Sequence, residues 1–195
     1  MTTSSILITF VACIGIQSLQ PAPALKVSDG EIKISAGTDS IATYVFRDAK
    51  IARPYFAHLH APGGIRVTRN HPPIAGKDAT DHAEFHPGLW LAFGDVSGAD
   101  SWRLKTAVRH EKFLIEPKME GDVCVFTVEN AHLAADGKKV LTREKCAFSI
   151  RVRTGGWLLT WDSEFRPAEG ELAFGDQEEM GLGVRMATPL TVKAG

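Results

Sequence analysis

Short apolar runs follow one another along most of the chain, and turns separate them. Residues 31–35 and 65–68 alternate apolar and polar side chains with the period of two that a half-buried strand requires. Residues 123–128, 147–152 and 157–161 are instead continuous runs rich in β-branched and aromatic residues. Glycines and prolines interrupt the chain at short intervals, as they do between antiparallel strands. The pattern predicts an all-β protein, built as an antiparallel β-sandwich.

The two ends of the chain depart from this framework. Residues 6–16 form an apolar run too short to span a bilayer comfortably, and Ala22-Pro23-Ala24 resembles a signal-peptide cleavage site. We expect a signal peptide over residues 1–24, a single β-sandwich domain over residues 25–195, and a periplasmic or extracellular location. A plain N-terminal strand is the alternative, because no lysine or arginine precedes the apolar run. Residues 181–188 read as a core strand close to the end of the sequence, so we expect the natural chain to continue.

Charge and composition exclude some classes of function. With 22 basic and 23 acidic side chains and a pI near 6.7, the chain has no basic stripe that would bind a nucleic acid. No segment after the leader is apolar over 18 residues, so we expect no stable membrane span. Cys124 and Cys146 lie on neighbouring predicted strands, where they either form a disulfide or pack as two small buried side chains. The sequence leaves the oligomeric state open.

Four of the seven histidines stand in two short segments. His58 and His60 are two residues apart, so both project from one face if residues 55–60 form an extended strand. His82 and His86 follow Asp81 in a second segment, and imidazole donates or accepts a proton near neutral pH. We expect His82 and His86 to be catalytic, and His60 and Asp81 to contact a substrate. Loop histidines that only bond to the backbone are the structural alternative.

A third group of polar residues stands near the C-terminal end. Glu178 and Glu179 precede the last predicted strand, and one of them is expected to act as a general base opposite a histidine acid. Arg69 and Arg185 are expected to bind substrate oxygens or a carboxylate. Trp102 follows a turn, so it is the tryptophan that we expect to contact a substrate, whereas the other three are expected in the core.

Five ordered blocks of the chain also carry a family resemblance: residues 53–56, residues 67–69, Asp81-His82 with residues 86–90, residues 94–102, and residues 181–187. In these blocks the chain resembles the bacterial family called methane oxygenase PmoA-like, whose function is unknown. The blocks extend over nearly the whole chain after the leader. In the family pattern two histidines stand together after Asp-His, whereas Glu84 and Phe85 precede His86 here, so His82 is the closer match.

The resemblance implies an exported all-β protein similar to the galactose mutarotase-like sandwich. Proteins of that type bind sugars on a concave sheet and use histidine and glutamate for proton transfer. On this basis we expect a carbohydrate ligand and an epimerase, a lyase or a glycoside-cleaving enzyme that needs no cofactor. The resemblance does not support methane oxidation, because a methane oxygenase subunit of that name is a membrane protein.

Two other functions remain open at this point. His58, His60, His82 and His86, with a carboxylate such as Asp81, would suit copper or zinc, so the chain is alternatively a metal-binding protein. The third possibility is a sugar-binding module without a proton-transfer pair.

Overall fold

The computed structural model describes residues 21–192, in which every regular element is a strand or a short 3₁₀ turn. The elements are β1 (Pro23–Ser28), β2 (Glu31–Ala36), β3 (Asp39–Val45), β4 (Tyr55–Ala57), β5 (His60–Ala61), η1 (Pro62–Gly64), β6 (Ile65–Arg66), β7 (Leu89–Phe93), β8 (Val108–Glu120), β9 (Val123–Leu133), β10 (Val140–Arg153), β11 (Gly156–Pro167), β12 (Met180–Val184) and η2 (Thr188–Leu190). The prediction of an all-β architecture is confirmed.

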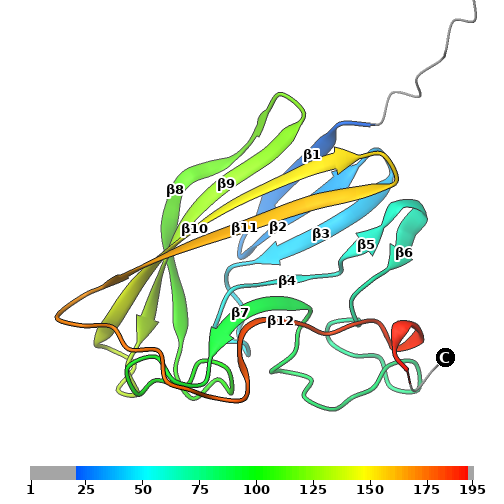
Figure 1. Cartoon of the computed structure of the whole chain (residues 1–195). Coiled ribbons are helices and arrows are strands. Elements are labelled where there is room, and N and C mark those ends of the chain that lie inside the picture. The colour runs from blue at the N-terminus through cyan, green and yellow to red at the C-terminus, as the bar shows by residue number, and fades with distance from the viewer. Residues whose placement is uncertain (1–20, 193–195) are drawn as a thin grey trace, which may run out of the picture.

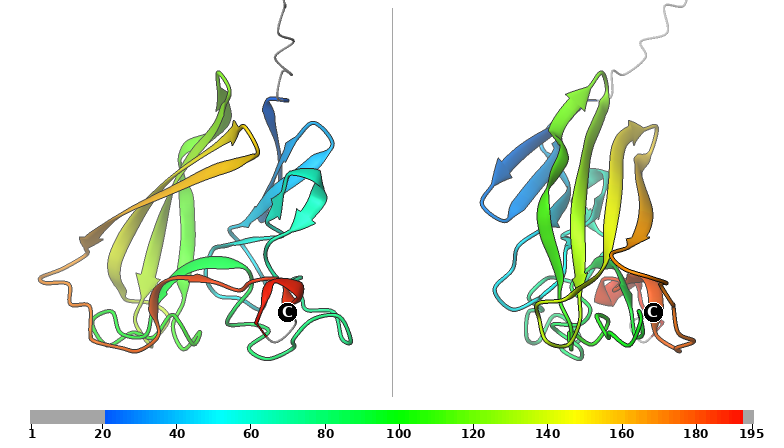
Figure 2. Two further views of the ribbon diagram at one scale, coloured as in Figure 1. Left: turned by 45° about the vertical axis from the view of Figure 1, so that its right-hand side comes forward. Right: turned by 90° about the vertical axis from the view of Figure 1, so that its left-hand side faces the viewer.

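Two antiparallel sheets form the two layers of a sandwich (Figure 1). The six-stranded sheet has the order β1-β2-β3-β4-β7-β12, the four-stranded sheet has the order β11-β10-β9-β8, and β5 pairs with β6 as a separate ribbon. Figure 2 shows that β7, β12 and the long loops between β6 and β8 gather at one end of the two layers. The loops that carry most of the predicted site residues therefore lie together at this end.

Alternation along the strands builds the core between the sheets. Ile32 and Ile34 of β2 point inward, as do Phe126 of β9 and Phe148 of β10, and all four are buried. Tyr44 lies among these aromatic rings, with its centroid 5.1 Å from that of Phe126 and 5.0 Å from that of Phe148. Burial of large apolar side chains is the main favourable contribution to folding, so this inter-sheet core is the principal source of stability.

One polar network interrupts the inter-sheet core. The buried Glu144 carboxylate lies 3.1 Å from His132 Nε2 and accepts a 2.7 Å hydrogen bond from the Ser163 hydroxyl. That hydroxyl in turn accepts a hydrogen bond from the indole nitrogen of Trp161. Partners of this kind are required because an unpaired carboxylate is costly to bury. The hydrogen bonds from His132 and Ser163 outweigh the cost of burying the carboxylate, so the pKa of Glu144 lies below its usual value.

A second apolar cluster covers the outer face of the six-stranded sheet. It contains Tyr55 and Ala57 of β4, Trp90 and Ala92 of β7, and Trp102 from the following loop. In β4 and β7 these residues alternate with Phe56 and Leu89, which pack on the inter-sheet core. The sheet is thus buried on both faces at this end, and the loops that bury the outer face also hold the polar residues considered below.

Two strand predictions are wrong in detail. The segment 55–60 is not one extended strand, because His58 adopts a left-handed backbone conformation with φ of 54° and ends β4. His58 and His60 therefore do not share a strand face, since His60 begins β5 in a different sheet. The predicted core strand 181–188 contains β12, which is an edge strand with Leu182 63% exposed.

The disulfide interpretation of the cysteines is also wrong in this structure. Cys124 of β9 is paired in register with Ile150, whereas Cys146 of β10 is paired with Val128. The two thiols are buried and free, offset by four residues along the strands. They pack as small side chains in the inter-sheet core.

The predicted signal peptide lies mostly outside the described residues. Pro23 and Ala24, its last two positions, belong to β1 and pair with Ala36 and Ser35 of β2. Within the described part of the chain, no helix is long and apolar enough to cross a membrane.

Candidate functional site

Two buried arginines hold the loops at the end of the sandwich. Arg69 is 1% exposed, and its guanidinium donates hydrogen bonds to the carbonyl oxygens of Ala79, Asp81, His82 and His86. Five donors in a planar fork allow one arginine to bind several carbonyls at once. Sequence reasoning assigned Arg69 to substrate contact. Its position instead gives it the role of fixing the backbone of the segment 79–86.

Arg53 fixes the backbone of the neighbouring loops in the same way. Its guanidinium donates to the carbonyl oxygens of Ser101 and Trp102, each at 2.7 Å, and to that of Phe85. The guanidinium carbon lies 5.6 Å from the ring centroid of Trp90, within range of a cation–π contact. Burial lowers the pKa of Arg53 to about 10, which still leaves the side chain charged at neutral pH.

Asp81, His82 and Arg185 form a hydrogen-bonded chain at the surface of these loops. One carboxylate oxygen of Asp81 lies 3.2 Å from His82 Nδ1, and the other accepts a 2.5 Å hydrogen bond from Arg185. These two partners lower the pKa of Asp81 to about 2, so the carboxylate is ionised at neutral pH. The His82 backbone has φ of 48°, in the left-handed region, and its side chain is 54% exposed. His82 is thus an exposed imidazole oriented by a carboxylate.

His86 lies in a stack of three rings. Its centroid is 5.0 Å from that of His82 on one side and 4.8 Å from that of the buried Trp90 on the other. Burial, followed by the charges of His82 and Arg185, lowers the pKa of His86 to about 4. The His86 ring is therefore neutral at pH 7. In that state one ring nitrogen accepts a hydrogen bond and the other donates one.

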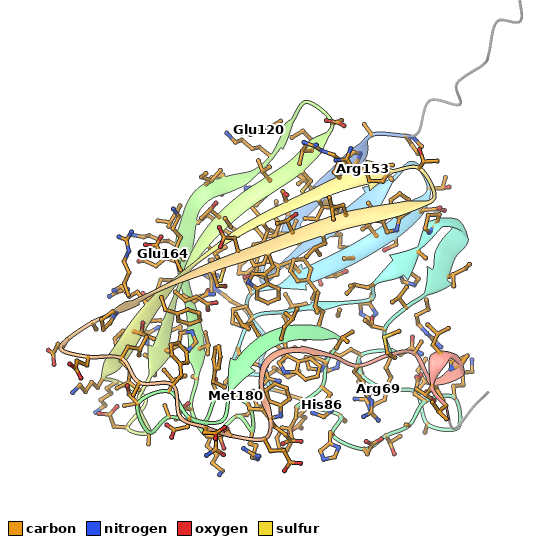
Figure 3. The ribbon with its side chains drawn as sticks, in the orientation of Figure 1. Arg69, His86, Glu120, Arg153, Glu164 and Met180 are labelled. Atoms are coloured by element: carbon orange, nitrogen blue, oxygen red, sulfur yellow. The ribbon has the colours of Figure 1, made fainter. Side chains whose placement is uncertain are left out.

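β12 brings the C-terminal residues to the same place. The backbone N–H of Arg185 donates to the Gly88 carbonyl, and that of Arg69 donates to the Arg185 carbonyl, so Arg185 is held between two loop segments. Glu179 pairs with Arg103 at 3.1 Å, and its negative charge opposes the fall in the pKa of His86. Figure 3 shows Arg69, His86 and Met180, the first residue of β12, at this end of the molecule. We call Asp81, His82, His86, Glu179 and Arg185 the histidine–arginine cluster.

The remaining predicted site residues lie apart from this cluster or beneath it. His60 is on the β5–β6 ribbon, where Nδ1 lies 2.7 Å from the carbonyl oxygen of His58 and its own carbonyl accepts from Trp157. Trp102 is 8% exposed and packs edge to face against Trp90, so it belongs to the outer-face cluster and not to an open surface. Glu178 is exposed on the segment that precedes β12.

The four histidines of the metal-binding alternative are not brought together. His82 and His86 stack, whereas His58 lies between β4 and β5 and His60 begins β5. Among residues 21–192, no group of three or more His, Cys, Asp or Glu side chains is arranged to hold a metal ion. The described residues therefore offer no structural support for a copper or zinc site.

A family model matches residues 31–195, which include every residue of the histidine–arginine cluster. It is the model of DUF6807, a family of unknown function. The chain belongs to this family. No curated protein and no solved structure matches the chain. Membership of DUF6807 therefore leaves the activity to be inferred from the residues themselves.

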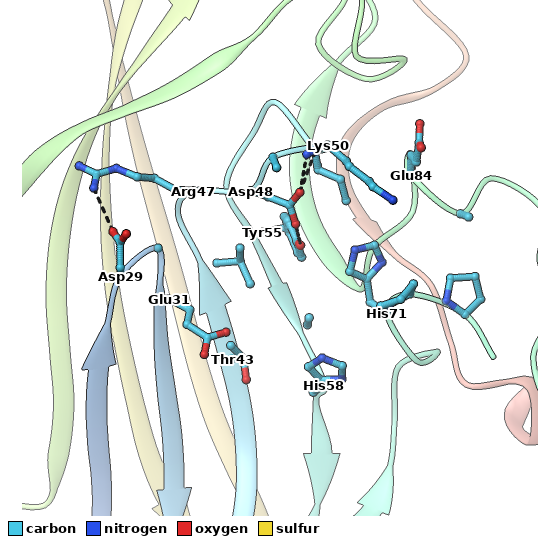
Figure 4. A pocket seen from close by; sticks show the side chains of 18 residues that line it. Asp29, Glu31, Thr43, Arg47, Asp48, Lys50, Tyr55, His58, His71 and Glu84 are labelled. Carbon is cyan, nitrogen blue, oxygen red and sulfur yellow. Dashed lines mark hydrogen bonds and ion pairs between the residues drawn. The ribbon is translucent and has the colours of Figure 1, made fainter.

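Sequence reasoning missed one feature of this DUF6807 chain. A cavity of about 630 Å³ lies on the outer face of the six-stranded sheet. Figure 4 shows Tyr55, His58 and His71 around it, with Glu84 at its edge. His71 lies between the two histidine segments of the sequence and was not among the predicted site residues. A cue was nevertheless present, because Tyr55 and Ala57 alternate with the core residue Phe56 and so had to face something else.

Proposed function

We propose that the chain binds a carbohydrate at the histidine–arginine cluster and acts on it by proton transfer. The observation that carries this proposal is the convergence of a carboxylate–imidazole pair, a second imidazole, an arginine and a glutamate from separated parts of the chain. Perturbed titratable groups that meet on loops of a rigid scaffold are the usual mark of a functional site.

His82 is the proton-transfer residue in this proposal. When Nδ1 donates its proton to Asp81, the tautomer is fixed and Nε2 is left with a free lone pair. An imidazole oriented by a carboxylate in this way takes up a proton at Nε2 and then donates it, so it serves as the acid of an acid–base pair. Arg185 keeps Asp81 ionised and fixed, so it acts through the carboxylate as a positioning residue.

His86 and Glu179 are the other two members of the cluster that would contact the sugar. His86 is neutral and stacked beneath His82, so it offers a rigid surface and a hydrogen-bonding nitrogen. We assign Glu179 as the general base opposite a histidine acid, and its pairing with Arg103 holds it near His86. A sugar hydroxyl both donates and accepts, so it can bond to a carboxylate and an imidazole at once. The reaction class is an epimerisation, an elimination or a glycoside cleavage, each of which needs such a pair.

The test is turnover on a broad panel of glycosides and oligosaccharides, followed by product analysis. We expect His82→Ala to reduce turnover by roughly 100-fold or more, the usual contribution of general acid–base catalysis. Asp81→Asn should reduce turnover as well and change its pH profile, because the amide no longer fixes the His82 tautomer. Circular dichroism should show both variants folded, since both side chains are half exposed.

Glu179→Gln and Glu178→Gln form a matched pair on adjacent residues. Only the first should lower turnover, because only Glu179 reaches the cluster. Full turnover by His82→Ala would overturn the catalytic role. Binding without turnover by the unaltered protein would favour the non-catalytic sugar-binding module, and a stoichiometric metal that survives dialysis would favour the metal-binding alternative.

A further inference from the structure

The cavity on the outer face of the six-stranded sheet has a floor, two walls and a rim. Thr43, Val45, Tyr55 and Ala57 form the floor, since these residues of β3 and β4 point away from the inter-sheet core. The residues 47–51 form one wall, and His58 with the residues 71–73 forms the other (Figure 4). Ala83 and Glu84 lie at the rim, in the turn that carries His82 and His86. We call this cavity the Tyr55 pocket.

A hydrogen bond to Asp48 holds the Tyr55 hydroxyl, at the floor of the pocket, in one orientation. The Tyr55 hydroxyl donates a 2.7 Å hydrogen bond to Asp48, whose other carboxylate oxygen accepts from the backbone N–H groups of Lys50 and Ile51. These bonds lower the pKa of Asp48 and oppose the cost of its burial, and burial raises the pKa of Tyr55. The phenol therefore stays protonated, and its oxygen is left as an acceptor for a ligand hydroxyl.

Two neutral imidazoles line the wall opposite Asp48. Burial lowers the pKa of both His58 and His71, so neither ring is charged at neutral pH. The His71 ring packs edge to face on Tyr55 with centroids 5.3 Å apart. Its Nδ1 is buried without a hydrogen-bond partner among the described residues. A buried, unpaired nitrogen is costly, and a ligand hydroxyl would satisfy it.

Several of the charges around the pocket are already compensated. Asp29 pairs with Arg47 at 3.5 Å, Glu31 pairs with Lys33 at 3.0 Å, and Asp48 accepts three hydrogen bonds. Lys50 and Glu84 also line the pocket, with opposite charges, and the rest of the surface offers uncharged polar groups beside apolar side chains such as Ile51 and Pro72. The volume falls within the range that encloses a small organic molecule. A ring that carries hydroxyls on its edge and C–H groups on its faces matches both kinds of surface.

We propose that the Tyr55 pocket binds an uncharged sugar unit, whose hydroxyls bond to Tyr55, His58 and His71. This inference rests on the proposed carbohydrate function and specifies the sugar class as neutral. An acidic sugar is disfavoured because the carboxylates that line the pocket outnumber the cations: Asp29, Glu31, Asp48 and Glu84 against Arg47 and Lys50. Arg47 is moreover paired with Asp29.

NMR resonances of the histidine rings provide a direct test, because the Tyr55 pocket and the histidine–arginine cluster carry two histidines each. The full chain would be titrated with the methyl glycosides of glucose, galactose and mannose, and with methyl glucuronoside as the charged probe. We expect at least one neutral glycoside to shift the resonances of His58 and His71, and methyl glucuronoside to bind at least roughly tenfold more weakly. Single histidine substitutions assign the signals.

The outcomes separate this inference from the proposed function. Shifts confined to His82 and His86 would overturn the pocket assignment and leave the histidine–arginine cluster as the sugar site. Shifts confined to His58 and His71 would support the pocket and count against the cluster. If no sugar shifts any of the four, both proposals fail. Equal or tighter binding of the glucuronoside would overturn the assignment of an uncharged ligand.

The only two tyrosines of the chain supply a matched control. Tyr55→Phe should weaken binding of the neutral glycoside by roughly tenfold, the value of one hydrogen bond. Tyr44→Phe removes the same buried hydroxyl from the neighbouring strand but on the inter-sheet side, so it should leave the affinity unchanged. Thr43→Val, which keeps the shape of the floor, is the second test should Tyr55→Phe fold poorly. Unchanged affinity in a folded Tyr55→Phe protein would contradict the proposal.

Discussion

The two faces of the six-stranded sheet are stabilised in different ways. On the inner face, apolar and aromatic side chains from regular strands pack against the second sheet, with Glu144 and His132 as a buried hydrogen-bonded pair. On the outer face, loops cover Trp90 and Trp102, and Arg53 and Arg69 hold those loops by their carbonyl oxygens. The inner face needs only strand alternation to form, whereas the outer face needs particular long side chains at particular positions.

This difference explains where chemistry can develop. Close packing between two sheets leaves little room for exposed polar groups, while loops anchored from below can carry charged residues at their surface. The backbones of His58 and His82 both lie in the left-handed region, a conformation that persists only where the surroundings hold it. Arg69 bonds to the carbonyl of His82 itself. The outer face is thus the part of the molecule in which small changes should affect function before they affect the fold.

The largest effect is expected from Arg69→Met. The substitution keeps an apolar stem but removes the Arg69 donor from four carbonyl oxygens, of which that of His82 keeps a second donor, the His86 N–H. We expect a loss of roughly 3–4 kcal/mol in the free energy of unfolding. Urea unfolding measures the loss. Arg69→Lys should rescue only part of it, because one ammonium group cannot reach all four carbonyls.

Arg66→Met is the control for this substitution. Arg66 comes from the same segment, but its ion pair with Asp78 spans 3.9 Å and its side chain is partly exposed. The expected cost is below roughly 1 kcal/mol. Equal unfolding midpoints for the two methionine variants would refute the anchoring role of Arg69.

The structure of the inner face could be predicted from the sequence, whereas that of most of the outer face could not. Alternation in residues 31–35 and the apolar runs of β9, β10 and β11 are local patterns, and each one corresponds to a strand of the sandwich. The roles of Arg69 and Trp102 depend on which carbonyls and rings the loops bring near them. No local pattern encodes that information. For the same reason the sequence left open whether residues 55–60 form one extended strand, and in the structure His58 turns the chain out of β4.

The predicted site residues also divide into those that are close in sequence and those that only the fold brings together. His82, His86 and Asp81 are close in sequence, so a single turn keeps them together, and the His86 N–H donates to the His82 carbonyl. Arg185 and Glu179 join them through the pairing of β12 with β7, which the sequence does not specify. The Tyr55 pocket combines segments from the β1–β2 turn to residue 84, so only a folded structure reveals it.

On the inner face, Glu144→Gln should cost roughly 2–3 kcal/mol, because hydrogen bonds to a buried charge are the strong ones. The loss should appear in urea unfolding while the resonances of His82 and His86 stay unchanged, since the network lies between the sheets. Glu164→Gln, on the same strand pair but exposed, should change stability by less than roughly 0.5 kcal/mol. Sugar binding altered by Glu144→Gln would contradict the separation of the two faces.

Gly183→Ala tests the contact between β12 and the ring stack. A Cβ atom at residue 183 would overlap the Trp90 ring, on which His86 stacks, so either the strand or the stack must move. We expect a cost of about 1–2 kcal/mol, as in other overpacked sites, together with a shift of the His86 resonance. Gly156→Ala on β11 meets no atom within 4 Å and should leave both measurements unchanged. An undisturbed His86 signal in Gly183→Ala would show that β12 does not fix the stack.

The smallest effect is expected from pH, and it sharpens the comparison by acting through His86. The pKa of His86 is about 4 in the folded chain and near 6.5 when unfolded, so between these values the unfolded state binds more protons. Stability should therefore fall as pH decreases from 6.5 towards 4. His86→Gln removes the titrating ring, so its unfolding free energy should decrease less between pH 7 and pH 5 than that of the unaltered protein. The difference between the two pH values is the informative quantity, because the lost stacking lowers stability at both. Identical pH dependence in the two proteins would mean that His86 is not buried against Trp90 in its neutral form.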